Sequence, residues 1–189
     1  GIAAAASITA QAEWMQNANG YYYVNNGQVV YNNWLRMTGS DGNYIYYYVG
    51  QDGYMVKGWK QIGNVWYYFE DNGVMASSGW KQIGGEWYYL QSNGQMATGW
   101  INITQNGTTK YYYLKDSGAM VTGWRQIDGA WYYFLEDGSA VIGQWARVNN
   151  LWYCFGTDGK MLTGWHQQNG VYYYLDPSDG KMLTGWLTD

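Results

Sequence analysis

The sequence predicts an all-β solenoid of stacked β-hairpins, with about three hairpins per turn. Tryptophan returns from Trp14 to Trp186 at separations of 20, 25, 21, 20, 24, 21, 20 and 21 residues. An aromatic run such as Trp66-Tyr67-Tyr68 follows each of the first eight, and usually a glycine two residues before a methionine comes next. A fixed period of this length indicates one structural repeat copied along the chain. We therefore expect residues 14–189 to form a single array of eight to nine repeats, and residues 1–13 to be a mature N-terminus or an expression remnant.

The elements of one repeat can be justified in order from residues 58–78. Residues 59–62 alternate large apolar and polar side chains, which is typical of a half-buried strand. Gly63-Asn64 is a short turn signal, and the aromatic segment Val65–Phe69 favours a second strand. Residues 70–73 form another turn before the chain reaches the next Gly-Trp. Because a lone hairpin is marginal in water, the hairpins must stack.

Three irregular repeats indicate the helical repeat of the solenoid. The Gly-Trp tryptophan lies 7 residues before the aromatic run in most repeats, but 12 in the second (Trp34 to Tyr46) and 11 in the fifth (Trp100 to Tyr111). These two repeats and the eighth, with Tyr172, begin the run with Tyr instead of Trp. Since they are three repeats apart, a turn of about three hairpins would align them along one edge.

The longer hairpins carry two further expectations. The Trp100/Tyr111 and Trp34/Tyr46 pockets should be empty of ligand, or blocked by residues 102–109 and 38–43. The same hairpins should project as a ridge that is open to a different partner or to self-association as a homodimer.

Composition excludes several classes of partner. Aromatic residues make up 20% of the chain, with 22 Tyr and 13 Trp against 3 Phe. Tyr and Trp are favoured where one end of a ring is dry and the other meets water or a ligand. Charged residues are 13% and the net charge is −4, which argues against nucleic acid because basic clusters are missing. No apolar stretch approaches the roughly 18 residues of a membrane span.

Catalytic and metal chemistry find little support in the sequence. The single cysteine, Cys154, excludes an internal disulfide, and it reads better as a buried apolar residue than as a catalytic thiol. The only histidine, His166, cannot support a catalytic triad or a metal cluster. Most of the 14 acidic residues lie in turns, and the nonapeptides of calcium β-rolls are absent. We therefore expect no enzyme activity, metal or cofactor.

Stretches such as GWKQIGGEWYYLQSNGQMATGW and GWRQIDGAWYYF resemble the choline-binding (cell-wall-binding) repeats of Gram-positive surface proteins and lysins. The resemblance covers essentially everything after Glu13. The Trp that begins the run distinguishes these repeats from the related glucan-binding and clostridial toxin repeats. The resemblance implies a left-handed superhelix of hairpins with choline held between consecutive hairpins by two Trp and one Tyr, often above a Met. It also implies a secreted, surface-associated protein whose partner is choline-decorated teichoic or lipoteichoic acid, or another wall polysaccharide.

The resemblance implies four complete cages. They are Trp59, Trp66 and Tyr88; Trp80, Trp87 and Tyr112; Trp124, Trp131 and Tyr153; and Trp145, Trp152 and Tyr173. Met75, Met96 and Met161 are candidate floors. Because side chains alternate along a strand, Trp87 and Tyr88 should point in opposite directions. The second Tyr of each run, such as Tyr68 or Tyr89, is expected to fill the interior.

Two other classes of function stay open. A sugar-binding array is one, since aromatic faces also stack on glucan rings and repeats one, two, five and eight begin their runs with Tyr. A surface spacer or adhesin that displays its repeats to a host is the other. A catalytic domain elsewhere in a longer parent chain cannot be inferred from these residues.

Overall fold

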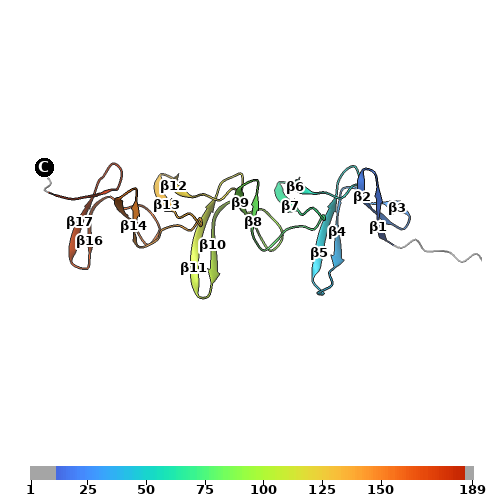
Figure 1. The fold of residues 1–189 in the computed structure, drawn as a ribbon, viewed down its shortest axis with the longest axis horizontal. Helices are drawn as coiled ribbons and strands as arrows, with labels where there is room; N and C mark the ends of the chain where they lie inside the picture. The colour runs from blue at the N-terminus through green and yellow to red at the C-terminus, as the bar shows by residue number, and fades with distance from the viewer. Residues whose placement is uncertain (1–11, 186–189) are drawn as a thin grey trace, which may run out of the picture. The chain divides into compact units, whose positions relative to one another are not determined.

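The computed structural model describes residues 12–185, which contain eighteen β-strands and no helix. The strands form successive antiparallel hairpins, as the all-β prediction requires (Figure 1). The chain divides into two compact units, residues up to 81 with 89–96, and residues 82–88 with 97 onward. The boundary passes through the fourth hairpin. Trp186 and most of the predicted N-terminal segment lie outside the described residues, and the single continuous array stays a prediction.

Eight hairpins follow one another at the period of the repeat. Hairpins one to four are β1 (Glu13–Asn17) with β2 (Gly20–Asn25), β4 (Asn33–Thr38) with β5 (Tyr44–Val49), β6 (Gly58–Ile62) with β7 (Val65–Phe69), and β8 (Gly79–Ile83) with β9 (Glu86–Leu90). Hairpins five to eight are β10 (Gly99–Gln105) with β11 (Thr108–Leu114), β12 (Gly123–Ile127) with β13 (Ala130–Phe134), β14 (Trp145–Val148) with β15 (Leu151–Cys154), and β16 (Gly164–Gln168) with β17 (Val171–Leu175). Two short strands, β3 (Gln28–Val29) and β18 (Met182–Leu183), extend the first and last sheets.

The interior is filled by the residue that ends each aromatic run. The most buried of these are Val49, Phe69, Leu90, Leu114, Phe134, Phe155 and Leu175, each at most 1% exposed. The prediction that Tyr68 and Tyr89 fill the interior is wrong, because both are only half-buried. Tyr68 pairs with Trp59 across the hairpin and packs edge-on against its ring, with centroids 5.2 Å apart. Phe69 is on the opposite face of the strand, where its cross-strand partner is Gly58.

The glycine–methionine spacing fastens each repeat to its neighbours. The Met161 N–H donates to the Trp131 carbonyl, 2.8 Å away in the preceding hairpin, and the Met96 N–H donates to the Trp66 carbonyl at 2.9 Å. The side chains of Met55, Met75, Met120 and Met161 each lie against a glycine of the following repeat. Gly180, at φ +78°, has no room for a Cβ, which would meet Met161 Sδ at 2.5 Å. The motif is therefore a two-sided link between repeats.

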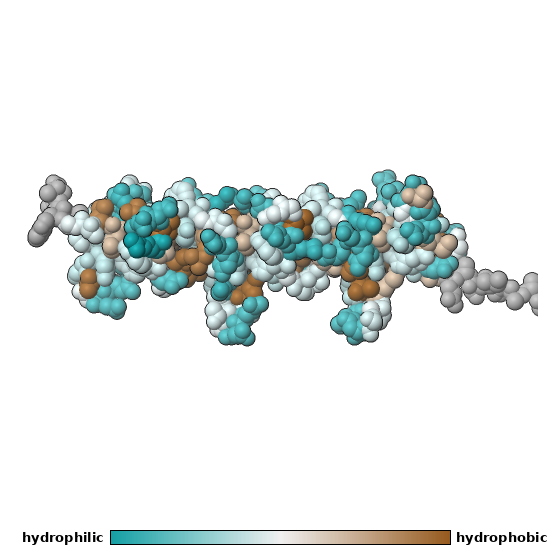
Figure 2. All heavy atoms as spheres, viewed as in Figure 1, coloured by the Kyte–Doolittle hydropathy of each residue, from teal (hydrophilic) through white to brown (hydrophobic). Residues whose placement is uncertain are grey.

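The threefold repetition is visible inside the second compact unit. Hairpins β10–β11 and β16–β17 extend to the same side of this unit, and β12–β13 points elsewhere (Figure 1). Hairpins five and eight are three repeats apart, so their alignment matches a turn of about three hairpins. The protruding tip of β10–β11 is hydrophilic (Figure 2).

Candidate functional site

A cavity of about 360 Å³ in the second compact unit contains the complete third cage. Trp124 comes from β12, Trp131 from β13 and Tyr153 from β15, and Met161 follows that strand. The hairpin register explains why the two tryptophans share a face. Trp124 is opposite Tyr133 and Trp131 is opposite Gln126, so all four side chains belong to one side of the hairpin.

The three rings of this cage present faces in different directions. The Trp124 and Trp131 centroids are 6.4 Å apart with an interplanar angle of 82°, and the Trp124 and Tyr153 centroids are 4.8 Å apart at 72°. Trp131 is 42% exposed and lines the cavity, so its side chain is accessible to solvent. The arrangement offers an aromatic box that is dry on several sides and open at its mouth.

The Trp124 ring is held from both hairpins. Its own hairpin contributes Tyr133 at 5.1 Å, and the next contributes Phe155 at 5.8 Å in addition to Tyr153. The backbone hydrogen bond between Met161 and Trp131 also fixes the methionine relative to the outer tryptophan. Contacts within the protein therefore position the residues of the box.

The predicted alternation of neighbouring aromatic residues is seen in hairpin six. Trp131 lines the cavity shared with hairpin seven, whereas Tyr132 lines a different cavity shared with hairpin five. One hairpin thus contributes to two sites, one with each neighbour. Trp87 and Tyr88 occupy the same positions of the run in hairpin four.

Two residues of this cavity were missed by the sequence reading. Ser178 and Asp179 line it from the turn after hairpin eight, so the site uses three consecutive repeats rather than two. The Asp179 carboxylate accepts the Lys181 N–H at 3.1 Å and lies 3.4 Å from Lys181 Nζ. The sequence signal that could have found them is the Asp-Gly turn that recurs before the methionine, but only the helical rise of the stack shows which turn reaches which cage.

The fourth cage is also partly assembled. The Trp145 and Tyr173 rings are 5.0 Å apart at 62°, and His166 lies 6.1 Å from the same indole. The Trp145 indole N–H donates to Gln168 Oε1 at 2.7 Å, which fixes the ring. Trp152, the third predicted member, is 41% exposed on hairpin seven.

The first and second predicted cages draw residues from both compact units and stay predictions. Trp59, Trp66 and Trp80 belong to the first unit, and Tyr88, Trp87 and Tyr112 to the second. Each hairpin nevertheless exposes its outer indole, since Trp66 and Trp87 are both 40% exposed.

The three methionines predicted to form cage floors have different surroundings. Met161 lines the third cage, and Met96 is bonded to Trp66 as Met161 is to Trp131. Met75 instead donates its N–H to the Tyr46 carbonyl at 2.8 Å, beside hairpin two, which contains no Trp pair. The sequence reading missed Met120, whose N–H donates to Trp87 at 2.8 Å.

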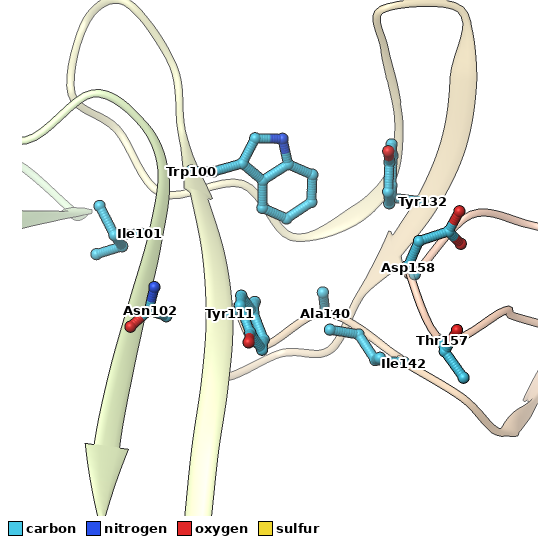
Figure 3. Close-up of a pocket in the computed structure, with 10 residues that line it drawn as sticks. Trp100, Ile101, Asn102, Tyr111, Tyr132, Ala140, Ile142, Thr157 and Asp158 are labelled. Atoms are coloured by element: carbon cyan, nitrogen blue, oxygen red, sulfur yellow. The ribbon is translucent and has the colours of Figure 1, made fainter.

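The Trp100/Tyr111 pocket is open, so the expectation that residues 102–109 block it is wrong, and the alternative that it takes no choline stays a prediction. The structure has a cavity of about 410 Å³ there, and Asn102 is the only member of residues 102–109 that lines it (Figure 3). The extra residues continue the strand pairing from Asn102–Tyr111 to Gln105–Thr108. They lengthen the hairpin beyond the pocket instead of folding over it.

The described residues also bear on the possibility of a metal site, a membrane-spanning helix or a reactive cysteine. Residues 12–185 contain no cluster of His, Cys, Asp or Glu suited to a metal ion. They also form no helix that is long and apolar enough to cross a membrane. Cys154 is 3% exposed, as its interpretation as a buried apolar residue requires, and burial raises the pKa of its thiol.

Known protein families with the same kind of repeat match more than half of the chain. A family described as the choline-binding repeat matches residues 77–122, 121–161 and 141–186. A second family, described as a cell wall binding repeat, matches residues 57–75. Comparison with curated proteins gives no significant match.

Several solved structures are similar to the chain. CbpF in complex with ipratropium is 30% identical with a TM-score of 0.78, over 92% of this chain and 60% of CbpF. Choline binding protein F from Streptococcus pneumoniae, crystallised with a peptidoglycan analogue, is 36% identical with a TM-score of 0.71, over 86% of this chain and 55% of that protein. The choline-binding domain of CbpL from Streptococcus pneumoniae is 32% identical with a TM-score of 0.63, over 92% of this chain and 87% of that domain. The chain therefore spans only part of the length of the first two proteins.

Proposed function

The chain belongs to the choline-binding repeat family, and from this premise we propose that it is a non-catalytic module that attaches a secreted protein to the cell wall. Its ligand would be choline on teichoic or lipoteichoic acid. The observation that carries the proposal is the cavity in which Trp124, Trp131 and Tyr153 meet beside Met161.

The chemistry of this cavity suits a quaternary ammonium group. Such a cation cannot donate hydrogen bonds, so a protein holds it with ring faces, each contributing roughly 0.5–2 kcal/mol. The methionine adds a polarisable contact, and the Asp179 carboxylate, which is paired with Lys181, also lines the cavity. A single cage would bind weakly, and several cages on a polymer that bears many cholines would gain avidity of about 10²–10⁴.

The peptidoglycan analogue crystallised with choline binding protein F supports a role at the wall, since that protein is 36% identical to this chain. The activity of a longer parent protein is a separate matter. We propose that any catalytic function would reside outside this array.

Choline titration followed by tryptophan fluorescence tests the proposal. Choline should change the emission saturably, whereas 3,3-dimethylbutanol, which has the same shape without the charge, and dextran should not. Trp131→Ala should remove one site. Trp165→Ala is the matched control, because Trp165 is 66% exposed and belongs to none of the four cages.

The proposal fails if choline at tens of millimolar leaves the spectrum unchanged while dextran alters it. It also fails if the neutral isostere binds as well as choline, because the cage would then be only an apolar hollow.

A further inference from the structure

The cavity between hairpins five and six differs chemically from the proposed choline cages. Figure 3 shows Trp100 and Tyr111 on one side of a space and Tyr132 on the other, with Ala140 and Ile142 at its lower edge. Trp100 and Tyr111 are 41% and 40% exposed, so both rings are available to a ligand. All of these residues belong to the second compact unit.

The ring packing and the backbone link of this cavity repeat those of the third cage. Trp100 packs on Tyr113, Tyr132 and Phe134 at 5.2, 4.9 and 5.6 Å, as Trp124 does on its three equivalent rings. The Ala140 N–H donates to the Tyr111 carbonyl at 2.8 Å, which repeats the methionine link. The difference between the two sites therefore lies in the side chains.

Two cage positions carry different side chains here. Tyr111 takes the place of the outer tryptophan and brings a hydroxyl, and Ala140 takes the place of the methionine, so that Ala140 and Ile142 line the floor. A quaternary ammonium would lose one large ring face and the thioether contact. The ammonium group also has no hydrogen-bond donor for the Tyr111 hydroxyl.

Polar side chains surround the same space. Thr157 and Asp158 line it from the turn after hairpin seven, and Asn102 lines it from β10, at the opposite end beside Tyr111 (Figure 3). Asp158 Oδ1 accepts the Lys160 N–H at 3.0 Å, and its second oxygen can accept a hydrogen bond from a ligand. Ring faces, hydrogen-bonding groups and a small apolar floor are thus combined in one cavity.

We propose that this cavity binds an N-acetylated hexose unit of a glycan. The pyranose C–H face would stack on an exposed aromatic ring, and the acetamido methyl would enter the floor formed by Ala140 and Ile142. The acetamido N–H and ring hydroxyls would bond to Asp158, Asn102 and Thr157. The site goes beyond the proposed choline function and does not depend on it.

Binding of chitotriose in the presence of saturating choline tests this inference by calorimetry. Cellotriose is the matched ligand, because it has the same linkage and lacks the acetamido group. We expect chitotriose to bind at least tenfold more tightly than cellotriose, since a site built for a hydrogen-bonding group discriminates against an analogue that lacks it. Equal affinity for the two sugars, or competition between chitotriose and choline, would overturn the proposal.

Variants distinguish this site from a choline cage. Asp158→Asn should weaken chitotriose about tenfold and leave choline unaffected, whereas Asp179→Asn should leave chitotriose unaffected. The double variant Tyr111→Trp/Ala140→Met should lose chitotriose and gain one choline site. The assignment to a sugar is wrong if the wild-type site already takes choline. In that case the double variant would bind no more choline than the wild type.

Discussion

At the scale of single residues, the turn after hairpin six depends on one short polar network. Ser139 is 5% exposed, and its hydroxyl donates to Asp137 Oδ1 at 2.5 Å while its N–H donates to the same oxygen at 2.9 Å. Lys110 Nζ adds a contact at 3.3 Å to the other oxygen. Partial burial acts to raise the pKa of Asp137, but the Ser139 and Lys110 contacts outweigh it and lower the pKa below 3.8.

This network predicts a pH-dependent cost for Ser139→Ala. The folded pKa of Asp137 is depressed, so its contribution is present above the unfolded value of 3.8 and is lost as the pH falls through the folded value. We expect Ser139→Ala to lower the free energy of unfolding by about 1 kcal/mol at pH 7, and by less as Asp137 becomes protonated. Thermal unfolding at pH 7, 4 and 2 measures this.

Ser117→Ala is the matched control, since the Ser117 hydroxyl accepts the Ala119 N–H at the equivalent turn. Its cost should not vary with pH. A cost of Ser139→Ala that is the same at pH 7 and pH 2 would show that the carboxylate is not involved.

At the scale of the repeat, much of the structure could be predicted from the sequence. The strands expected at residues 59–62 and 65–69 correspond to β6 (Gly58–Ile62) and β7 (Val65–Phe69), because alternation and turn residues are local signals. Local sequence signals do not show whether Tyr68 or Phe69 fills the interior. The choice depends on the glycine opposite Phe69, and so on the register of the hairpin.

The link between methionine and glycine gives a prediction for Gly138→Ala. Gly138 has φ +85°, and an added Cβ would overlap the Met120 side chain. Gly129→Ala is the matched control, because Gly129 has φ +83° and nothing within 4 Å of the added Cβ. Both variants should be destabilised by the backbone strain, about 1 kcal/mol or more, and Gly138→Ala should lose at least about 1 kcal/mol beyond that.

Denaturant unfolding of the two variants provides the measurement. Truncation of Met120 in a Gly138→Ala/Met120→Ala double variant should remove part of the difference. Equal destabilisation of the two single variants would mean that the methionine contact does not constrain Gly138.

At the scale of the whole molecule, repetition should matter more than any one cage. We predict that Trp66→Ala/Trp131→Ala lowers the affinity for free choline only modestly, because the remaining sites are kept. Retention on a choline-bearing wall polymer should fall by tenfold or more, because avidity multiplies the contributions of the sites. Column retention and free-choline titration of the same double variant provide the comparison, and equal losses in both would exclude multivalent attachment.

The composition of each site could be predicted only in part at this scale. The Trp124, Trp131 and Tyr153 set follows from the repeat spacing and the resemblance. Ser178 and Asp179 do not, because their position depends on how far one turn of the stack rises. Blocking of the pocket beside Tyr111 was one of two expectations, because the sequence shows the length of the hairpin but not the direction in which its tip projects.

The use of three repeats by one cavity has a mechanical consequence. Trp124 and Asp179 line the same cavity although hairpins seven and eight lie between them in the sequence. A ligand bound there would contact residues of all three repeats. A pulling force that separates hairpin eight from the stack would therefore also have to break the contacts of the ligand. If force acts on the C-terminal side of the array, the same contacts would hold the ligand and resist unfolding of the last repeat.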